Sequence, residues 1–279
     1  MYKEFYRLRE RPFSITSDPN FLFFSRTHRE AMSHMLFGIR ERKGFIAITG
    51  EIGTGKTTLC KAVLNELGEA ARTAYIFNPS LSGVQLMENI LEDFGVAPVR
   101  RNKGAMFKQL NLFLIEELSA ERNVILIIDE AQNLKQSLFE QIRMLSNLET
   151  EKEKLLQIVF VGQPQLTARL NSPALTQLKQ RIAVRYHLAP LDRDEIGQYI
   201  YHRLKVAGSS DNIIFTPEAL EVIATYSSGL PRVINIVSDR CLLHGYVKGT
   251  MHIDDDIVLK SISEIEGVEY RANVAVAQR

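Results

Sequence analysis

The stretch Gly50-Glu51-Ile52-Gly53-Thr54-Gly55-Lys56-Thr57, followed by Thr58, decides the fold of this chain. It fits the pattern of two glycines separated by four residues and followed by Lys and Ser/Thr, which is typical of a loop that binds phosphate groups. Because glycine has no Cβ, the backbone can turn successive N–H groups inward around phosphate oxygens. We expect Lys56 to reach the β- and γ-phosphates and the Thr57 hydroxyl to bind Mg²⁺.

The residues around this loop support the interpretation. Residues 45–48 are a short apolar run of the buried-strand type, and residues 57–64 continue as a helix with an apolar stripe. A strand, a loop and a helix therefore follow one another in the order that points a helix N-terminus at an anion. The alternative is a glycine-rich turn that binds nothing, but such a turn does not require the Lys-Thr pair. We therefore take residues 50–58 as the nucleotide-binding loop.

The rest of the chain alternates between strands and helices. Further strands are predicted at residues 73–77, 124–128, 156–162 and 183–188, and helices at residues 26–42, 82–94, 104–120 and 136–149. This alternation predicts an α/β fold of the P-loop NTPase type, a parallel sheet sandwiched by helices.

After Pro190 the pattern contains helices and no further strand. We expect a nucleotide-binding domain over residues 1–190, a small all-helical lid domain over residues 191–266, and a tail over residues 267–279. Within the second domain, Asp192 and Glu195 are placed to form a capping box, and Thr216-Pro217 is placed to begin a helix.

The N-terminal segment is unusually aromatic. Seven of the fourteen phenylalanines lie within residues 1–45, which argues against a disordered tail. We expect irregular packed structure up to about Ser25. Residues 24–28 either line an adenine pocket or pack against the sheet edge.

Composition limits the classes of protein to consider. The chain has 279 residues, with 34 basic against 33 acidic side chains, so no global charge recruits nucleic acid or an anionic membrane. No apolar run approaches the roughly 18 residues that span a bilayer, and the N-terminus lacks a signal-peptide pattern. Only Cys60 and Cys241 are present, which excludes a disulfide framework and disfavours a cysteine metal site. These features predict a cytoplasmic protein.

Two acidic residues follow the most apolar predicted strand. Asp129 and Glu130 come directly after residues 124–128, at the edge where such sheets bind ligands. There Asp129 can hold Mg²⁺ together with Thr57, while Glu130 polarises a water for attack on the γ-phosphate of ATP. The alternative is a polar turn that ends the strand.

At this point the chain resembles a known family. The phosphate loop, the Asp-Glu pair and the Gly-x-Pro-Arg turn before a late helix look like an AAA+ ATPase. The N-terminal run, which includes Arg11-Pro12-Phe13 and His28-Arg29-Glu30-Ala31, and the later Gly162-Gln163-Pro164 narrow the resemblance. Together they are similar to the ExeA/GspA type of general secretion pathway ATPases and their pilus-biogenesis relatives, over about residues 1–266.

The resemblance implies roles for further residues. Gln163 would be the sensor that contacts the γ-phosphate or the attacking water, and Arg232 a second sensor from the helical domain. Arg181, or alternatively Arg185, would be the arginine finger that reaches the ATP of a neighbouring subunit. Asn78 would restrain Glu130 before assembly.

The resemblance also implies a homo-oligomer, in the form of a ring, that acts as a motor or assembly factor for secretion or pilus machinery. Some family members continue through a membrane span to a peptidoglycan-binding domain. This chain stops earlier, so we expect a cytoplasmic protein that is peripheral at the inner membrane only through a partner. The alternative function is an ATP-dependent DNA-binding regulator, like the transposition ATPases; the near-neutral charge favours the secretion role over nucleic acid.

Overall fold

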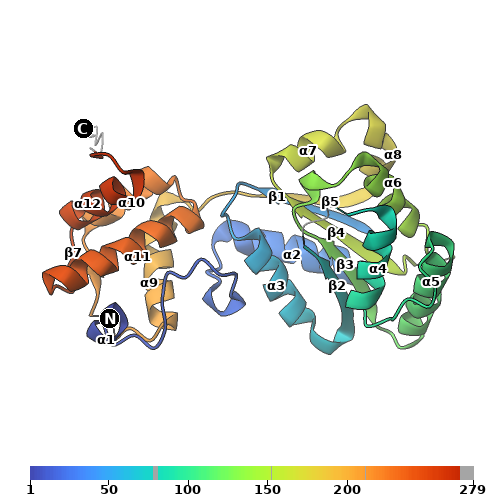
Figure 1. Cartoon of the computed structure of the whole chain (residues 1–279), viewed down its shortest axis with the longest axis horizontal. Helices are drawn as coiled ribbons and strands as arrows, with labels where there is room; N and C mark the ends of the chain where they lie inside the picture. The colour runs from blue at the N-terminus through green and yellow to red at the C-terminus, as the bar shows by residue number, and fades with distance from the viewer. Residues whose placement is uncertain (78–80, 152, 211, 271–279) are drawn as a thin grey trace. The chain divides into compact units, whose positions relative to one another are not determined.

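The computed structural model describes residues 1–77, 81–151, 153–210 and 212–270. These residues divide into two compact units (Figure 1). The sheet unit contains residues 26–51 and 56–188, and the helical unit contains residues 1–25, residues 52–55 and the residues from Ala189 onward. Asn78, which the family resemblance suggests would restrain Glu130, lies outside the described residues.

The sheet unit is built on five parallel strands, as predicted. They are β1 (Phe45–Gly50), β2 (Ala71–Ile76), β3 (Asn123–Ile128), β4 (Leu156–Gly162) and β5 (Ile182–Leu188). Their order in the sheet is β2-β3-β4-β1-β5. Strands β1 and β4 are buried along their whole length, because neighbouring strands flank them and helices cover both faces.

Helices cover both faces of this sheet (Figure 1). On one face, Phe45 and Ala47 of β1 join a core with residues of the helices α4 (Gly83–Asp93), α5 (Lys103–Ser119), α6 (Gln136–Leu145), α7 (Pro164–Leu170) and α8 (Thr176–Arg181). On the other face lie α2 (Arg26–Arg40) and α3 (Lys56–Leu67). Helix α2 approaches the sheet at Gly38, where an added Cβ would lie 2.7 Å from Ile46 Cδ1.

The strand order determines which residues can meet. Strands β3, β4 and β1 are consecutive neighbours and run in the same direction. Their carboxyl ends therefore lie at one edge of the sheet, next to Asp129, Gln163 and the phosphate loop. The amino ends, which carry Gly44, Lys154 and Arg181, form the opposite edge.

Some predicted boundaries differ from the structure. Helix α6 ends at Leu145 rather than at residue 149, because the chain turns there and pairs Glu149 with Lys154 in an antiparallel bridge. Helices α7 and α8 were not predicted, since seven and six residues are too few to show a helical periodicity.

The helical unit contains the predicted helices after Pro190. These are α9 (Arg193–Val206), α10 (Pro217–Ser227), α11 (Pro231–Lys248) and α12 (Asp255–Glu266). The Glu195 side chain accepts a bond from the Asp192 N–H at 3.1 Å, and the Thr216 hydroxyl accepts one from the Ala219 N–H at 3.2 Å, as predicted.

The expectation of no strand in this region was wrong. The strands β6 (Ile214–Phe215) and β7 (His252–Ile253) form a parallel pair. Each has two residues, which is too short for an alternating pattern to be read, and their pairing depends on tertiary contacts between distant segments.

The aromatic N-terminal segment packs within the helical unit. It forms α1 (Tyr2–Phe5) and the 3₁₀ turn η1 (Pro19–Phe21), and Tyr6, Phe13 and Phe21 are buried in the core of this unit. Arg203 of α9 holds the segment, because its guanidinium donates to the Pro12 carbonyl at 2.5 Å and to the Ser14 carbonyl at 2.9 Å. Most of the segment that the sequence places with the nucleotide-binding domain therefore belongs to the core of the helical unit.

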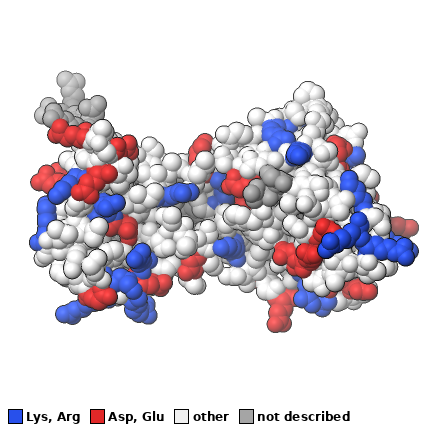
Figure 2. Space-filling model, viewed as in Figure 1, with Lys and Arg blue, Asp and Glu red and all other residues white. Residues whose placement is uncertain are grey.

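No helix in the described part of the chain combines the length and the apolar character that crossing a membrane requires. Basic and acidic side chains are intermixed over the visible face (Figure 2), in keeping with their near-equal numbers.

Candidate active site

The phosphate loop connects β1 to α3 and closes around its own lysine. Gly53 and Gly55 have φ values of 85° and 94°, a region in which a side chain would be strained, so the loop depends on glycine at both positions. The Lys56 ammonium donates to the carbonyls of Gly50 and Glu51, both at 2.8 Å. Burial lowers the pKa of Lys56, while the negative charges of Glu130, Asp129 and Glu51 oppose that shift. The ammonium is thus held where an anion can replace the two carbonyls as its partner.

Asp129 lies at the carboxyl end of β3 and is only 1% exposed. Its Oδ2 accepts hydrogen bonds from the Thr57 hydroxyl and from the Tyr75 hydroxyl, each at 2.7 Å. Its Oδ1 accepts from the N–H of Glu130 at 2.8 Å. The two acidic residues of the predicted site are therefore next to the first turn of α3.

Tyr75 is a site residue that the sequence did not reveal. Burial, more than the negative charge of Asp129 and the hydrogen bond to it, raises the pKa of the Tyr75 phenol, so the hydroxyl remains a donor to Asp129. In the sequence Tyr75 is one aromatic residue in a strand, and only the pairing of β2 with β3 brings it to Asp129.

The oxygen atoms at Thr57 and Asp129 fit a magnesium ion. Mg²⁺ prefers hard oxygen ligands, binds through one or two carboxylates and keeps several waters or phosphate oxygens. The hydroxyl and the carboxylate oxygen lie 2.7 Å apart. Among the described residues, no group of three or more His, Cys, Asp or Glu side chains could hold a metal by itself, so nucleotide oxygens would have to complete the coordination.

Glu130 follows Asp129 in a left-handed backbone conformation, with φ of 50° and ψ of 36°. Such a conformation is uncommon for a residue with a side chain, and it gathers at functional sites. Here it begins the 3₁₀ turn η3 (Ala131–Asn133). The Gln163 side chain, at the carboxyl end of β4, donates to Glu130 Oε2 at 3.1 Å. The structure thus brings the predicted base and the predicted sensor into contact.

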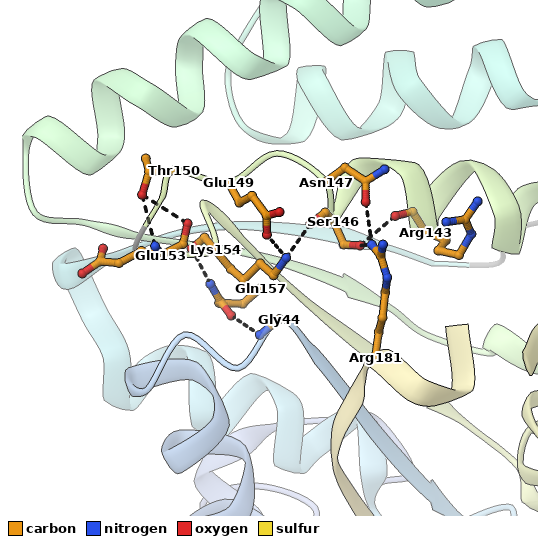
Figure 3. A network of polar contacts seen from close by, with 10 residues as sticks. All are labelled: Gly44, Arg143, Ser146, Asn147, Glu149, Thr150, Glu153, Lys154, Gln157 and Arg181. Atoms are coloured by element: carbon orange, nitrogen blue, oxygen red, sulfur yellow. Dashed lines mark hydrogen bonds and ion pairs between the residues drawn. The ribbon is translucent and has the colours of Figure 1, made fainter. Parts of the chain in front are cut away.

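Arg181 lies at the other edge of the sheet (Figure 3). Its Nη1 donates to Ser146 Oγ at 2.7 Å and to Asn147 Oδ1 at 2.6 Å, both beyond the end of α6. Ile182, the next residue, pairs with Phe45 at the start of β1. Because β1 rises about 3.3 Å per residue, Arg181 is separated from Gly50 by roughly 16 Å along the strand.

The polar side chains around Arg181 contact one another and form a network within one copy of the chain. Figure 3 shows Lys154 pointing toward Glu149 and Ser146, and its ammonium pairs with the Glu149 carboxylate. Burial, helped by the positive charge of Arg181, lowers the pKa of Lys154. Arg185, the other candidate finger, lies on β5 and donates to the Lys179 carbonyl at 3.2 Å.

Arg232 is the second residue of α11 in the helical unit. Its backbone N–H donates to the carbonyl of Gly53 at 3.2 Å, and a Cβ on Gly53 would lie 2.6 Å from the Arg232 Cβ. Both residues belong to the helical unit, which includes residues 52–55 of the phosphate loop. A side chain at position 53 would therefore clash with Arg232 and would also be strained by the positive φ at that position.

Comparisons with known proteins agree with this arrangement. A family model described as an AAA domain matches residues 39–170, which run from the end of α2 to the end of α7. General secretion pathway protein A of Aeromonas hydrophila is 40% identical over 270 residues. That match covers 96% of this chain and 49% of the relative, so the chain spans about half the length of that protein.

Solved structures show the same fold at low sequence identity. The ORC2 protein of Aeropyrum pernix in its ADPNP-ADP complexes superimposes with a TM-score of 0.69 at 20% identity, covering 92% of this chain and 72% of that one. Cdc6p of Pyrobaculum aerophilum gives 0.68 at 17% identity, over 96% and 74%. The RuvB branch migration motor of Thermotoga maritima gives 0.55 at 20% identity, over 87% and 69%. The fold and the family model together assign an AAA ATPase domain to this chain, and nearly the whole chain is similar to general secretion pathway protein A.

Proposed function

We propose that this chain works as a homo-oligomer, in the form of a ring, in which each ATP is hydrolysed with the help of a neighbouring copy. In this proposal it serves as a motor or assembly factor for secretion or pilus machinery. Residues 191–266 act as the lid domain.

Within one copy, the carboxyl edge of the sheet supplies most of the chemistry. Lys56 and the N–H groups of residues 50–58 bind the phosphates of ATP. Thr57 and Asp129 hold Mg²⁺, which neutralises charge on the β- and γ-phosphates when bound. Glu130 accepts a proton from the attacking water, Gln163 orients that water, and Arg232 contacts phosphate as the second sensor.

The observation that carries the oligomer is the place of Arg181. A finger must touch the γ-phosphate oxygens, and Arg181 begins at the edge opposite its own phosphate loop, roughly 16 Å away along β1. An arginine side chain is too short to cross that distance. Its guanidinium is held near the surface by the side chains of Ser146 and Asn147, where a second copy can meet it.

A mixing experiment tests this proposal. Arg181→Ala and Lys56→Ala proteins should each be inactive, and their mixture should regain activity because some sites combine an intact loop with an intact finger. Both variants must first be shown to assemble with wild-type protein. An absence of rescue, together with a specific activity that does not change with protein concentration, would overturn the shared site.

The choice of partner needs a separate measurement. The relative that covers nearly the whole chain is named for the general secretion pathway, and this is the ground for proposing a secretion or pilus client, with any membrane contact made through that client. DNA is the competing partner. Binding to a DNA duplex with ATP, and with an affinity that falls steeply as salt is raised, would favour the regulator over the secretion role.

A further inference from the structure

Gln132 connects the two residues on which the proposed hydrolysis depends. It lies in the 3₁₀ turn directly after Glu130. Its side-chain Nε2 donates to Glu130 Oε2 at 2.5 Å, and its Oε1 accepts from the Gln163 N–H at 3.1 Å. One amide group therefore links the end of β3 to the end of β4.

Gly162 makes room for this amide. A Cβ on Gly162 would lie 2.6 Å from Gln132 Oε1, a distance that non-bonded atoms do not adopt. Gly162 is the last residue of β4, so the strand ends in a residue without a side chain at the point where the Gln132 amide passes over it.

The backbone of Gln132 is also fixed. The Arg169 guanidinium, from α7, donates to the Gln132 carbonyl, and it lies 5.2 Å from the centre of the Phe139 ring of α6. Contacts from two helices thus keep the turn in place without direct contact with a nucleotide.

Both amides that reach Glu130 bind the same oxygen. Gln132 and Gln163 donate to Oε2, and within the described part of the chain no hydrogen bond reaches Oε1. A carboxylate held in this way has a fixed orientation, and its second oxygen keeps its lone pairs for a proton.

We propose that Gln132 is a positioning residue that holds Glu130 by Oε2 and aims Oε1 at the attacking water. This inference rests on the proposed function, in which Glu130 is the base. As the water oxygen bonds to the γ-phosphorus, its proton passes to Oε1 and the bridging oxygen leaves with ADP. Gln132 also links Glu130 to Gln163, so the two move together when nucleotide binds.

The substitution Gln132→Met tests this role, because methionine has a similar length and neither donates nor accepts a strong hydrogen bond. Loss of one hydrogen bond to a charged group corresponds to a fall in kcat of about 10- to 100-fold. The affinity for ATP should stay within about twofold, since in the described structure Gln132 makes no hydrogen bond to a residue of the phosphate loop. Asn133→Ala, an exposed neighbour in the same turn, is the matched control and should keep the wild-type kcat.

A second measurement separates positioning from plain structural support. In a Glu130→Gln background, Gln132→Met should cause no further loss, because the group that it positions is already gone. A similar fold-loss in both backgrounds, or a Gln132→Met variant whose affinity falls as much as its kcat, would overturn the inference.

The inference and the proposed function fail in different ways. If Gln132→Met has the wild-type kcat while Glu130→Gln is inactive, only the inference fails. If Glu130→Gln itself turns over normally, the base is another residue and both fail.

Discussion

The two edges of the parallel sheet carry polar groups of different kinds. At the carboxyl edge, the charged residues Lys56 and Asp129 are 7% and 1% exposed. At the amino edge, the side chains of Lys154 and Glu149 are 35% and 47% exposed, and Arg181 is exposed as well. These charged side chains are buried at the carboxyl edge and partly or fully exposed to solvent at the amino edge.

This difference has an energetic meaning. Burying a charge is unfavourable unless hydrogen bonds and opposite charges compensate, whereas an exposed ion pair contributes about 0–1 kcal/mol. The buried charges at the carboxyl edge fit the proposed role in hydrolysis. The amino edge keeps Arg181 close to the surface, where a partner can desolvate it. The predictions below test this division, beginning with the largest effect.

Lys56→Ala should abolish ATP binding and with it hydrolysis, because the phosphate loop loses its side-chain cation for the β- and γ-phosphates. Calorimetric titration with ATP measures this directly. Lys61→Ala, on the exposed side of α3, is the control and should bind ATP as the wild type does. Equal affinities for the two variants would show that the loop is not the phosphate site.

Arg181→Ala should bind ATP normally and lose about 10³- to 10⁵-fold in hydrolysis rate, as expected for an arginine finger. The comparison with Arg185→Ala identifies the finger, since Arg181 ends α8 whereas Arg185 lies within β5 and donates to a backbone carbonyl. Steady-state ATPase rates at saturating ATP decide between them. If Arg185→Ala shows the large loss and Arg181→Ala does not, the amino edge contributes only surface charge.

Glu130→Gln should keep ATP bound and lower hydrolysis by about 10²- to 10⁴-fold, because the amide has the shape of the carboxylate but cannot accept the proton. Single-turnover measurements of ADP formation give the rate. A normal rate would transfer the role of base to another group at the carboxyl edge, with Asp129 as the next candidate.

Gln157→Leu should lower the stability of the fold and leave ATP affinity unchanged. Gln157 is buried near the amino edge, where its Oε1 accepts from the Gly44 N–H at 2.8 Å and its Nε2 donates to the Lys154 carbonyl at 3.1 Å. The buried Gly44 N–H would lose its partner, at a cost of about 1–3 kcal/mol in the free energy of unfolding. Urea unfolding without nucleotide measures this cost. A variant of wild-type stability with weaker ATP binding would contradict the division between the edges.

The sequence predicted the sheet and the phosphate loop because each depends on local patterns. A β-branch-rich apolar run such as residues 124–128 is typical of a strand covered on both faces, and a glycine-rich loop ending in Lys-Thr is typical of phosphate binding. The roles of Tyr75 and Gln132 were out of reach, since one depends on the pairing of β2 with β3 and the other on a turn that begins with a left-handed Glu130. The helices α7 and α8 were missed because a helix of six or seven residues shows no clear period.

The packing of the N-terminal segment could not be predicted for a different reason. Its aromatic residues indicate that the segment is buried, but they do not indicate whether it packs in the sheet unit or in the helical unit. Only the contacts of Arg203 and the burial of Tyr6 and Phe21 among the later helices give the answer.

That packing affects how the protein is made. The contact between Pro12 and Arg203 joins residues 191 positions apart, so the aromatic segment leaves the ribosome well before its partner helix exists. At about 5–20 residues per second, the delay is roughly 10–40 s. The strands of the sheet unit are all synthesised during that interval. Throughout it, Phe13 and Phe21 cannot reach their native core, because the helices that form it have not yet been made.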